Sequence, residues 1–355
     1  MTIHGGGFMN TQMQEILDAF NHLGPIPVEK TTPEVARQLP FMQKAIFEVL
    51  NEHAAKRLID GVIENVEAIE HRSMPGPRGP ILARIYHPEV RGAKKPVLLY
   101  FHGGGFVLGS LDAYDATCRA LTNLADCIVV SVAYRQAPEH KYPAAREDAF
   151  AAYEWLLRNA RDFGGNPKLI AVAGESAGGN LATLVCLMAR EKGLPQPLHQ
   201  LLVYPWVDSK MDTASYVSHQ FAKPLNAAAM KWFMNHYLAS PSQALDPMAF
   251  PLRHDNLSGL APATIFTAEI DPLCSEGKAY AEKLRQFGVP VHSQQFNGVT
   301  HEFFGLGAVL VEAEEALRIA GENLQIAFEG LPIDQDLQRT SPEDELAILQ
   351  MQMRL

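Results

Sequence analysis

The chain has 355 residues, of which 47% are hydrophobic and 20% are charged, and its formal net charge is −10. This composition is typical of a globular protein with a large core, and the acidic balance without a Lys/Arg-rich run argues against a nucleic-acid partner. The first twenty residues lack the pattern of a secretory signal, and no stretch approaches the ~18 consecutive apolar residues of a membrane span. The cysteines stand singly, without a CxxC pair, which predicts reduced thiols in a cytoplasmic protein.

The first 55 residues predict helices that come before any strand of the core. Apolar residues recur at helical spacing within residues 9–24, and Thr32 followed by Pro33 is typical of a helix start. We expect these helices to be an appendage on the core.

From about residue 62 the pattern predicts strands that alternate with helices. The expected strands lie at 62–70, 81–87, 96–101, 127–133, 169–173, 200–204, 264–268 and 291–296. The expected helices lie at 113–125, 144–160, 177–192 and 275–288. Runs that are apolar on both faces, separated by helices, predict an α/β fold with a mostly parallel sheet covered by helices on both faces.

The interval from Trp206 to Phe250 interrupts this alternation and is rich in aromatic residues. Ordinary helix packing would explain these rings, and so would an insertion that covers a pocket. After Gly330 comes a polar linker, and the capping box at 341–344 predicts a last helix that packs on a partner or lies loose.

The candidate nucleophile is Ser176, in the stretch GESAG at 174–178. This stretch follows the expected strand at 169–173 and precedes a helix-forming run. In this strand–turn–helix context, G-x-S-x-G indicates a nucleophilic serine. The sharp turn would lift the Ser176 hydroxyl above the sheet, and small flanking residues leave room for the turn.

The stretch HGGGF at 102–106 follows another expected strand, and its glycines would let backbone N–H groups face inward. The N–H groups of Gly103, Gly104 and Ala177 would together form an oxyanion hole. The same string occurs at 4–8, where it follows no core strand, and we expect that copy to be non-catalytic.

A serine nucleophile needs a base, and the base needs an orienting acid. Asp271 and His301 each follow an expected strand, on the edge of the sheet where Ser176 is expected and in the chain order Ser, Asp, His. The other downstream histidines fit less well, because they fall in the segment after Trp206 or inside a strand: His219, His236, His254 and His292.

The stretch from His301 begins like the zinc motif H-E-x-x-H, but Gly305 occupies the second histidine position. No Cys/His cluster has the spacing of metal ligands. We therefore expect neither a metal nor another cofactor.

Several motifs together resemble the hormone-sensitive-lipase family of bacterial esterases, over roughly residues 60–328. They are HGGGF at 102–106, YRQAPEHKYP at 134–143, GESAGG at 174–179, YP at 204–205, DPL at 271–273 and THEF at 300–303. The resemblance implies an α/β-hydrolase fold with a two-part helical cap. It also implies Ser176 as nucleophile, His301 as base and Asp271 as acid, with Gly103, Gly104 and Ala177 as oxyanion donors.

The resemblance also implies an organisation along the chain. Residues 1–55 would form the N-terminal cap helices, 56–205 and 251–330 the catalytic domain, 206–250 the second cap segment and 331–355 a C-terminal tail. Three positions depart from the family pattern: Gln136 stands where leucine is usual, Ser275 where an acidic residue is common, and Glu302 where glycine is frequent.

These observations predict a carboxylesterase that hydrolyses short- to medium-chain esters through an acyl-enzyme intermediate. An amidase or lactonase on the same residues is the alternative, and a non-enzymatic ligand receptor is a third interpretation. A small-molecule ester would be the partner, and a homodimer would be one way to cover an edge strand near 291–296.

Overall fold

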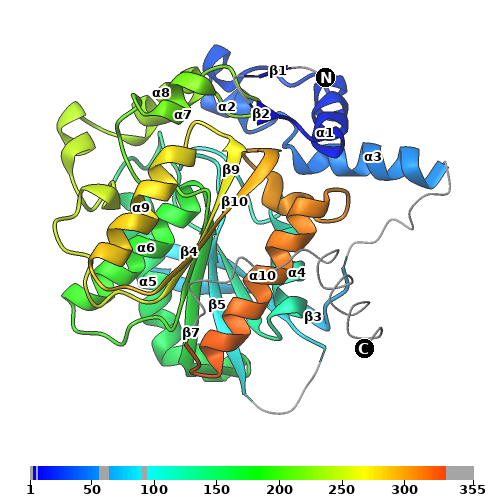
Figure 1. Ribbon diagram of the computed structural model, residues 1–355. Coiled ribbons are helices and arrows are strands. Elements are labelled where there is room, and N and C mark those ends of the chain that lie inside the picture. Colours follow the sequence, from blue (N-terminus) through cyan, green and yellow to red (C-terminus); the bar gives the residue numbers. More distant parts are fainter. Residues whose placement is uncertain (1–2, 5–6, 56–63, 90–93, 333–355) are drawn as a thin grey trace, which may run out of the picture.

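The computed structural model describes residues 3–4, 7–55, 64–89 and 94–332 of the chain. The described part contains an eight-stranded sheet with helices on both faces (Figure 1). The strands are β3 (Ala68–Gly76), β4 (Gly79–His87), β5 (Lys95–Phe101), β6 (Ile128–Ala133), β7 (Gly165–Glu175), β8 (Gln200–Val203), β9 (Ala263–Ile270) and β10 (Val291–Thr300). Their order across the sheet is β10-β9-β8-β7-β5-β6-β4-β3.

The sheet is mostly parallel, as expected. All neighbours from β10 to β6 pair in parallel, while β4 pairs antiparallel with both β6 and β3. Because the carboxyl ends of parallel strands meet at one edge, loops that follow β5, β7 and β9 lie close together. The strand expected near 291–296 is β10, and it is an edge strand.

The strand expected at 62–70 is wrong in its placement. The ladder of β3 with β4 runs from the Ala68–His87 pair to the Gly76–Gly79 pair, so the strand begins and ends six residues later than expected. Residues 64–67 lie outside the strand, and the carbonyls of Glu64 and Asn65 accept hydrogen bonds from helix α4 instead.

Two layers of helices cover the sheet. The helices are α1 (Thr11–His22), α2 (Pro33–Ala36), α3 (Gln43–Ala55), α4 (Asp115–Leu124), α5 (Ala144–Asn159), α6 (Ala177–Glu191), α7 (Ala214–Ser218), α8 (Ala227–Tyr237), α9 (Cys274–Gln286) and α10 (Val311–Phe328). Helices α5, α6 and α9 pack on one face, and α4 and α10 pack on the other (Figure 1). This arrangement confirms the doubly covered sheet.

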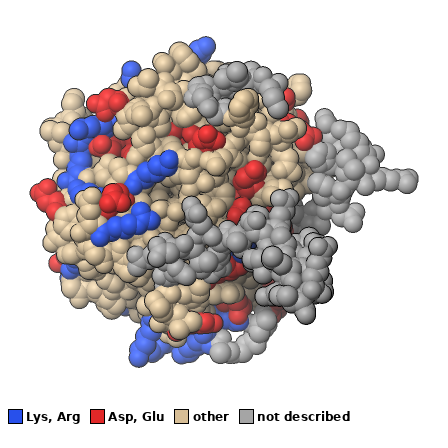
Figure 2. Space-filling model, in the orientation of Figure 1, with Lys and Arg blue, Asp and Glu red and all other residues tan. Residues whose placement is uncertain are grey.

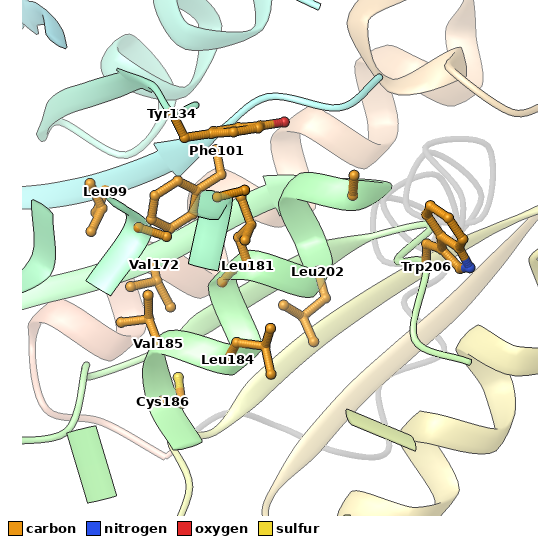
Figure 3. Close-up of a cluster of buried hydrophobic side chains, with 14 of the residues drawn as sticks. Leu99, Phe101, Tyr134, Val172, Leu181, Leu184, Val185, Cys186, Leu202 and Trp206 are labelled. Carbon is orange, nitrogen blue, oxygen red and sulfur yellow. The ribbon is translucent and has the colours of Figure 1, made fainter. Parts of the chain in front are cut away.

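Strand β5 shows why its sequence is apolar at successive positions. Leu99 and Phe101 belong to the core on the α6 side, where Figure 3 shows them in one cluster with Leu181, while Leu98 and Tyr100 belong to the core on the α4 and α10 side. Successive side chains of a strand point to opposite faces, so a strand between two helix layers has no polar face.

Helices α1, α2, α7 and α8 gather at one end of the molecule (Figure 1). Helix α1 matches the segment expected at 9–24, and its Asn10 cap accepts a hydrogen bond from the Met13 amide over 2.6 Å. The helix expected after residue 341 lies outside the described residues.

The second HGGGF copy differs from its expectation in one respect. We expected no strand to hold it, yet β1 (Ile3–His4) and β2 (Gly7–Phe8) form an antiparallel pair. The chain just after this pair is bonded to the edge of the main sheet, because the Asn10 amide donates to the Gly298 carbonyl over 3.0 Å. Phe8 is 68% exposed.

Charged residues on the face drawn in Figure 2 are mixed in sign, with lysines and arginines lying among acidic side chains. Among the described helices, none is both long enough and apolar enough to cross a membrane. All four cysteines are free and buried.

Candidate active site

Ser176 lies in a strained turn between β7 and α6. Its backbone has φ 55° and ψ −117°, a conformation that a non-glycine residue rarely adopts. A Cβ at Gly178 would stand 1.9 Å from the Phe101 carbonyl oxygen, and one at Gly174 would stand 2.2 Å from the Gly178 backbone. The two glycines of G-x-S-x-G are therefore required by close backbone contacts.

The surrounding strands fix the backbone of Ser176. Its amide donates to the Val203 carbonyl over 2.9 Å, and its carbonyl accepts from the amides of Asn180 and Trp206 over 3.1 Å each. Because Ser176 is also the N-cap of α6, its hydroxyl lies at the positive end of that helix.

Asp271 and His301, 30 positions apart, are brought together at the ends of β9 and β10. The Nδ1 atom of His301 lies 2.7 Å from Oδ2 of Asp271, and both side chains are buried. Burial lowers the pKa of His301, but the charge of Asp271 and its hydrogen bond raise it more, so the net direction is upward.

Ser176 and His301 line one cavity. Within the described residues, the Ser176 hydroxyl makes no hydrogen bond to His301. Such bonds are often long in the absence of substrate.

The loop after β5 brings Gly104 to the wall of the same cavity. Gly104 has φ +100°, and a Cβ there would stand 2.3 Å from the Leu108 carbonyl oxygen. Among the described residues, the amides of Gly104 and Ala177 donate no hydrogen bond, whereas the Gly103 amide interacts with the Tyr114 hydroxyl. The N–H groups of Gly104 and Ala177 are thus free to bind a ligand oxygen.

His102 stabilises this loop. Its ring stacks on that of Tyr134 with centroids 4.4 Å apart, and its Nδ1 lies 2.8 Å from the Gly103 carbonyl oxygen. Burial lowers the pKa of His102 to about 4, so the ring is neutral near pH 7 and donates through Nδ1.

Two residues from other segments also bind the loop. Gln136, at the position where the family usually has leucine, donates from Nε2 to the carbonyls of Leu108 and Gly109 over 2.7 and 3.0 Å. Arg37 donates to the Val107 carbonyl over 2.9 Å and pairs with both carboxylate oxygens of Glu139. These hydrogen bonds hold the pKa of Glu139 at about 2.

Glu175, next to the nucleophile, is buried beneath the site. It accepts hydrogen bonds from the hydroxyls of Tyr100 and Tyr204. Burial raises the pKa of Glu175 to about 7, although these hydrogen bonds lower it. The sequence did not single out Tyr100. Its only signal was a hydroxyl-bearing ring inside an otherwise apolar strand, which needs a polar partner.

The loop that carries Asp271 is fastened to α7. The Ser215 and Ser275 hydroxyls each accept a hydrogen bond from the other residue's amide, over 3.0 and 3.1 Å. Glu276 is also buried and accepts from the amides of Val207 and Asp208 over 2.7 and 3.1 Å. The serine at position 275, where the family commonly has an acid, thus links this loop to the segment after Trp206.

The cavity has a volume of about 190 Å³, and both the N-terminal segment and α8 contribute to its wall. Its apolar lining includes Phe20, Val28, Phe41, Trp206, Leu225 and Phe233. Its charged lining residues are Glu29, Lys223 and Glu302. In the described part of the chain, no group of three His, Cys, Asp or Glu side chains has the arrangement of a metal site.

Comparison with known proteins identifies the class. Residues 98–305 match the family described as alpha/beta hydrolase fold. The chain belongs to this family, and its relatives place it in the hormone-sensitive-lipase-like class that the motifs indicate.

Among the similar proteins is the carboxylic ester hydrolase LipN of Mycobacterium tuberculosis, which is 45% identical over 66% of this chain and 64% of its own length. The aligned part therefore spans less than two thirds of that relative. The ethyl acetate hydrolase of Pseudomonas putida is 37% identical over 76% of this chain and 86% of its own length. The solved structure of an esterase from Pyrobaculum calidifontis is 37% identical, covers 90% of this chain and 98% of its own, and has a TM-score of 0.79.

Proposed function

We propose that this protein is a carboxylic ester hydrolase that cleaves short- to medium-chain esters through a Ser176–His301–Asp271 triad. The observation that carries the proposal is that His301 lines the same cavity as Ser176 and lies 2.7 Å from the buried carboxylate of Asp271. The similar proteins named above are ester hydrolases by name, which supports the same chemistry here.

In this mechanism His301 accepts the proton of the Ser176 hydroxyl as the oxygen attacks the ester carbonyl. Asp271 orients the ring through Nδ1 and stabilises its cation. The N–H groups of Gly103, Gly104 and Ala177 stabilise the negative oxygen of the tetrahedral intermediate. The alcohol leaves with a proton from His301, and water activated by His301 then releases the acid from Ser176.

The size and lining of the cavity support small esters. Its volume of about 190 Å³ lies below the roughly 300–1,000 Å³ of pockets for drug-sized ligands. Its apolar walls suit a short acyl or alcohol chain.

The test is hydrolysis of p-nitrophenyl esters from acetyl to palmitoyl, together with labelling by a fluorophosphonate. We expect the highest kcat/KM among the short and medium chains, and label on Ser176. Ser176→Ala should lower kcat by about 10⁶-fold, as loss of a serine nucleophile does elsewhere.

The matched control is Ser110→Ala, at an exposed serine on the loop after HGGGF whose hydroxyl accepts only from the Ala113 amide among the described residues. This variant should keep its activity. Full hydrolysis by Ser176→Ala, or faster cleavage of a matched amide than of the ester, would contradict the proposal.

A further inference from the structure

Glu302 combines a glycine-like backbone with a carboxyl side chain in the cavity. Its backbone has φ 68° and ψ 12°, in the left-handed region that favours glycine. A side chain at this position therefore carries a conformational cost. Strained residues of this kind concentrate at functional sites.

The carboxyl of Glu302 lies beside the reacting groups without a partner of its own. Its side chain lines the cavity together with Ser176 and His301, and no described residue donates a hydrogen bond to it or forms an ion pair with it. Burial raises the pKa of Glu302, although His301 lowers it. When it is ionised, this carboxyl has no other positive partner among the described residues and would attract a cation in the cavity.

The titratable groups around Glu302 come from several elements. Those that interact with it electrostatically are Tyr114, Glu175, Tyr204 and His301. Except for His301 when it is protonated, none of these groups supplies a positive charge.

A second carboxyl, that of Glu29, lines the same cavity from the N-terminal segment. Its Oε1 accepts from the Asn226 amide nitrogen over 3.3 Å. Its Oε2 is buried and has no hydrogen-bond partner in the described part of the chain. The cavity therefore holds two incompletely paired acidic side chains.

The remaining wall suits a cation as well. Aromatic rings, including Phe20, Phe41 and Phe233, line the cavity, and the faces of such rings attract ammonium groups. Lys223 is the opposing charge, but it is exposed and donates to Asn21 over 3.2 Å. Solvent and salt screen an exposed charge more than a buried one.

We propose that the cavity selects esters that carry an ammonium group, and that Glu302 is the side chain that pairs with that cation. The proposal rests on the proposed ester hydrolysis and names the substrate class for it. Glu29 adds negative charge to the same cavity.

The test compares matched esters that differ in charge and hardly in size. Acetylcholine and 3,3-dimethylbutyl acetate place the charge in the alcohol. Ethyl 4-(trimethylammonio)butyrate and ethyl 5,5-dimethylhexanoate place it in the acyl chain. For at least one pair, we expect kcat/KM to favour the cationic ester by on the order of tenfold.

Glu302→Gln should lower that cationic-to-neutral ratio towards one, and Glu302→Gly should do the same on a backbone suited to φ 68°. The ratio cancels any effect on Ser176 or His301 that both esters share. Glu282→Gln, at a 62% exposed glutamate on α9, is the control and should leave the ratio unchanged.

The ratio should also rise with pH as Glu302 ionises, and this rise should be absent from Glu302→Gln. A ratio near one for both pairs overturns the inference, and so does a ratio that survives both substitutions at Glu302. If p-nitrophenyl butyrate is hydrolysed, such a result leaves the proposed function standing. If no ester is hydrolysed, the proposed function itself fails.

Discussion

The two copies of HGGGF have the same five residues and different surroundings. At 102–106 the string follows the buried strand β5, and His102 and Phe106 are each at most 1% exposed. At 4–8 the described residues belong to a two-stranded pair, and Phe8 is 68% exposed. The preceding strand places the loop at 102–106 at the end of the sheet. The position of HGGGF relative to the core therefore depends on the element before it.

The two phenylalanines show this difference most directly. The Phe106 ring stacks on that of Tyr237 with centroids 3.9 Å apart and packs near Trp206. Phe106 thus joins the loop after β5 to α8, whereas Phe8 has no comparable burial. A short motif is informative only when the elements on either side of it place it against a core.

The largest expected effect is on stability. Phe106→Ala should lower the free energy of unfolding by about 3–5 kcal/mol, because it removes a fully buried ring. Phe8→Ala should change it by less than about 0.5 kcal/mol. Urea denaturation followed by tryptophan fluorescence measures both. Equal losses would mean that the two copies are equally packed.

Next in size is the effect of a methyl group at the third position of each copy. Gly104→Ala should lower kcat/KM for p-nitrophenyl butyrate by about 10²–10³-fold, the cost of losing one oxyanion donor. The added Cβ would collide with the Leu108 carbonyl, which stands 2.3 Å away. Gly6→Ala should retain full activity. Comparable losses in both variants would show that the copy at 4–8 also takes part in catalysis.

The smallest expected effect concerns the histidines. Since the pKa of His301 is raised above its usual 6.5, kcat/KM should fall about tenfold per pH unit once the pH drops below that raised value. The pKa of His102 lies at about 4, so His102 adds no step between pH 5 and 8. His4→Asn should leave the profile in place. A shift of the acid limb in that variant would contradict the difference between the copies.

The same shifts give stability effects of opposite sign. A raised pKa for His301 contributes stability that is present below its unfolded value and is lost as pH rises through the folded value. A lowered pKa for His102 contributes stability that is present above about 6.5 and is lost as pH falls towards 4. Denaturation at several pH values in wild type and His102→Asn separates the second effect.

Much of this fold is legible in the sequence because its strands are buried on both faces. The run predicted at 96–101 matches β5 within one residue. The proposed nucleophile, base and acid were found because each comes within five residues after such a run. The strand expected at 62–70 was misplaced because the bounds of β3 are set by its pairing with β4. The local sequence pattern does not show which residues pair with another strand. Helix α10 was not predicted at all.

The residues that support the site were harder to find for a similar reason. Gln136 looked like a departure from a family pattern, yet it holds two carbonyls of the loop after HGGGF. The Ser215–Ser275 pair joins positions 60 apart in the chain. Contacts between distant loops follow from the tertiary fold, and a single sequence does not encode them in its periodicity.

Through Arg37 the N-terminal segment also contacts the loop after β5, besides lining the cavity. Its guanidinium makes four hydrogen bonds, to the carbonyls of Val107 and Ala137 and to both oxygens of Glu139. The N-terminal segment, which lines the cavity, is thereby tied to the backbone just after the glycines at 103–105. Deletion of the first forty residues would therefore remove the hydrogen bonds of Arg37 to the loop after β5 as well as part of the cavity wall. The kcat of the shortened enzyme should change along with its KM, because Arg37 joins the N-terminal segment that lines the cavity to the loop that carries those glycines.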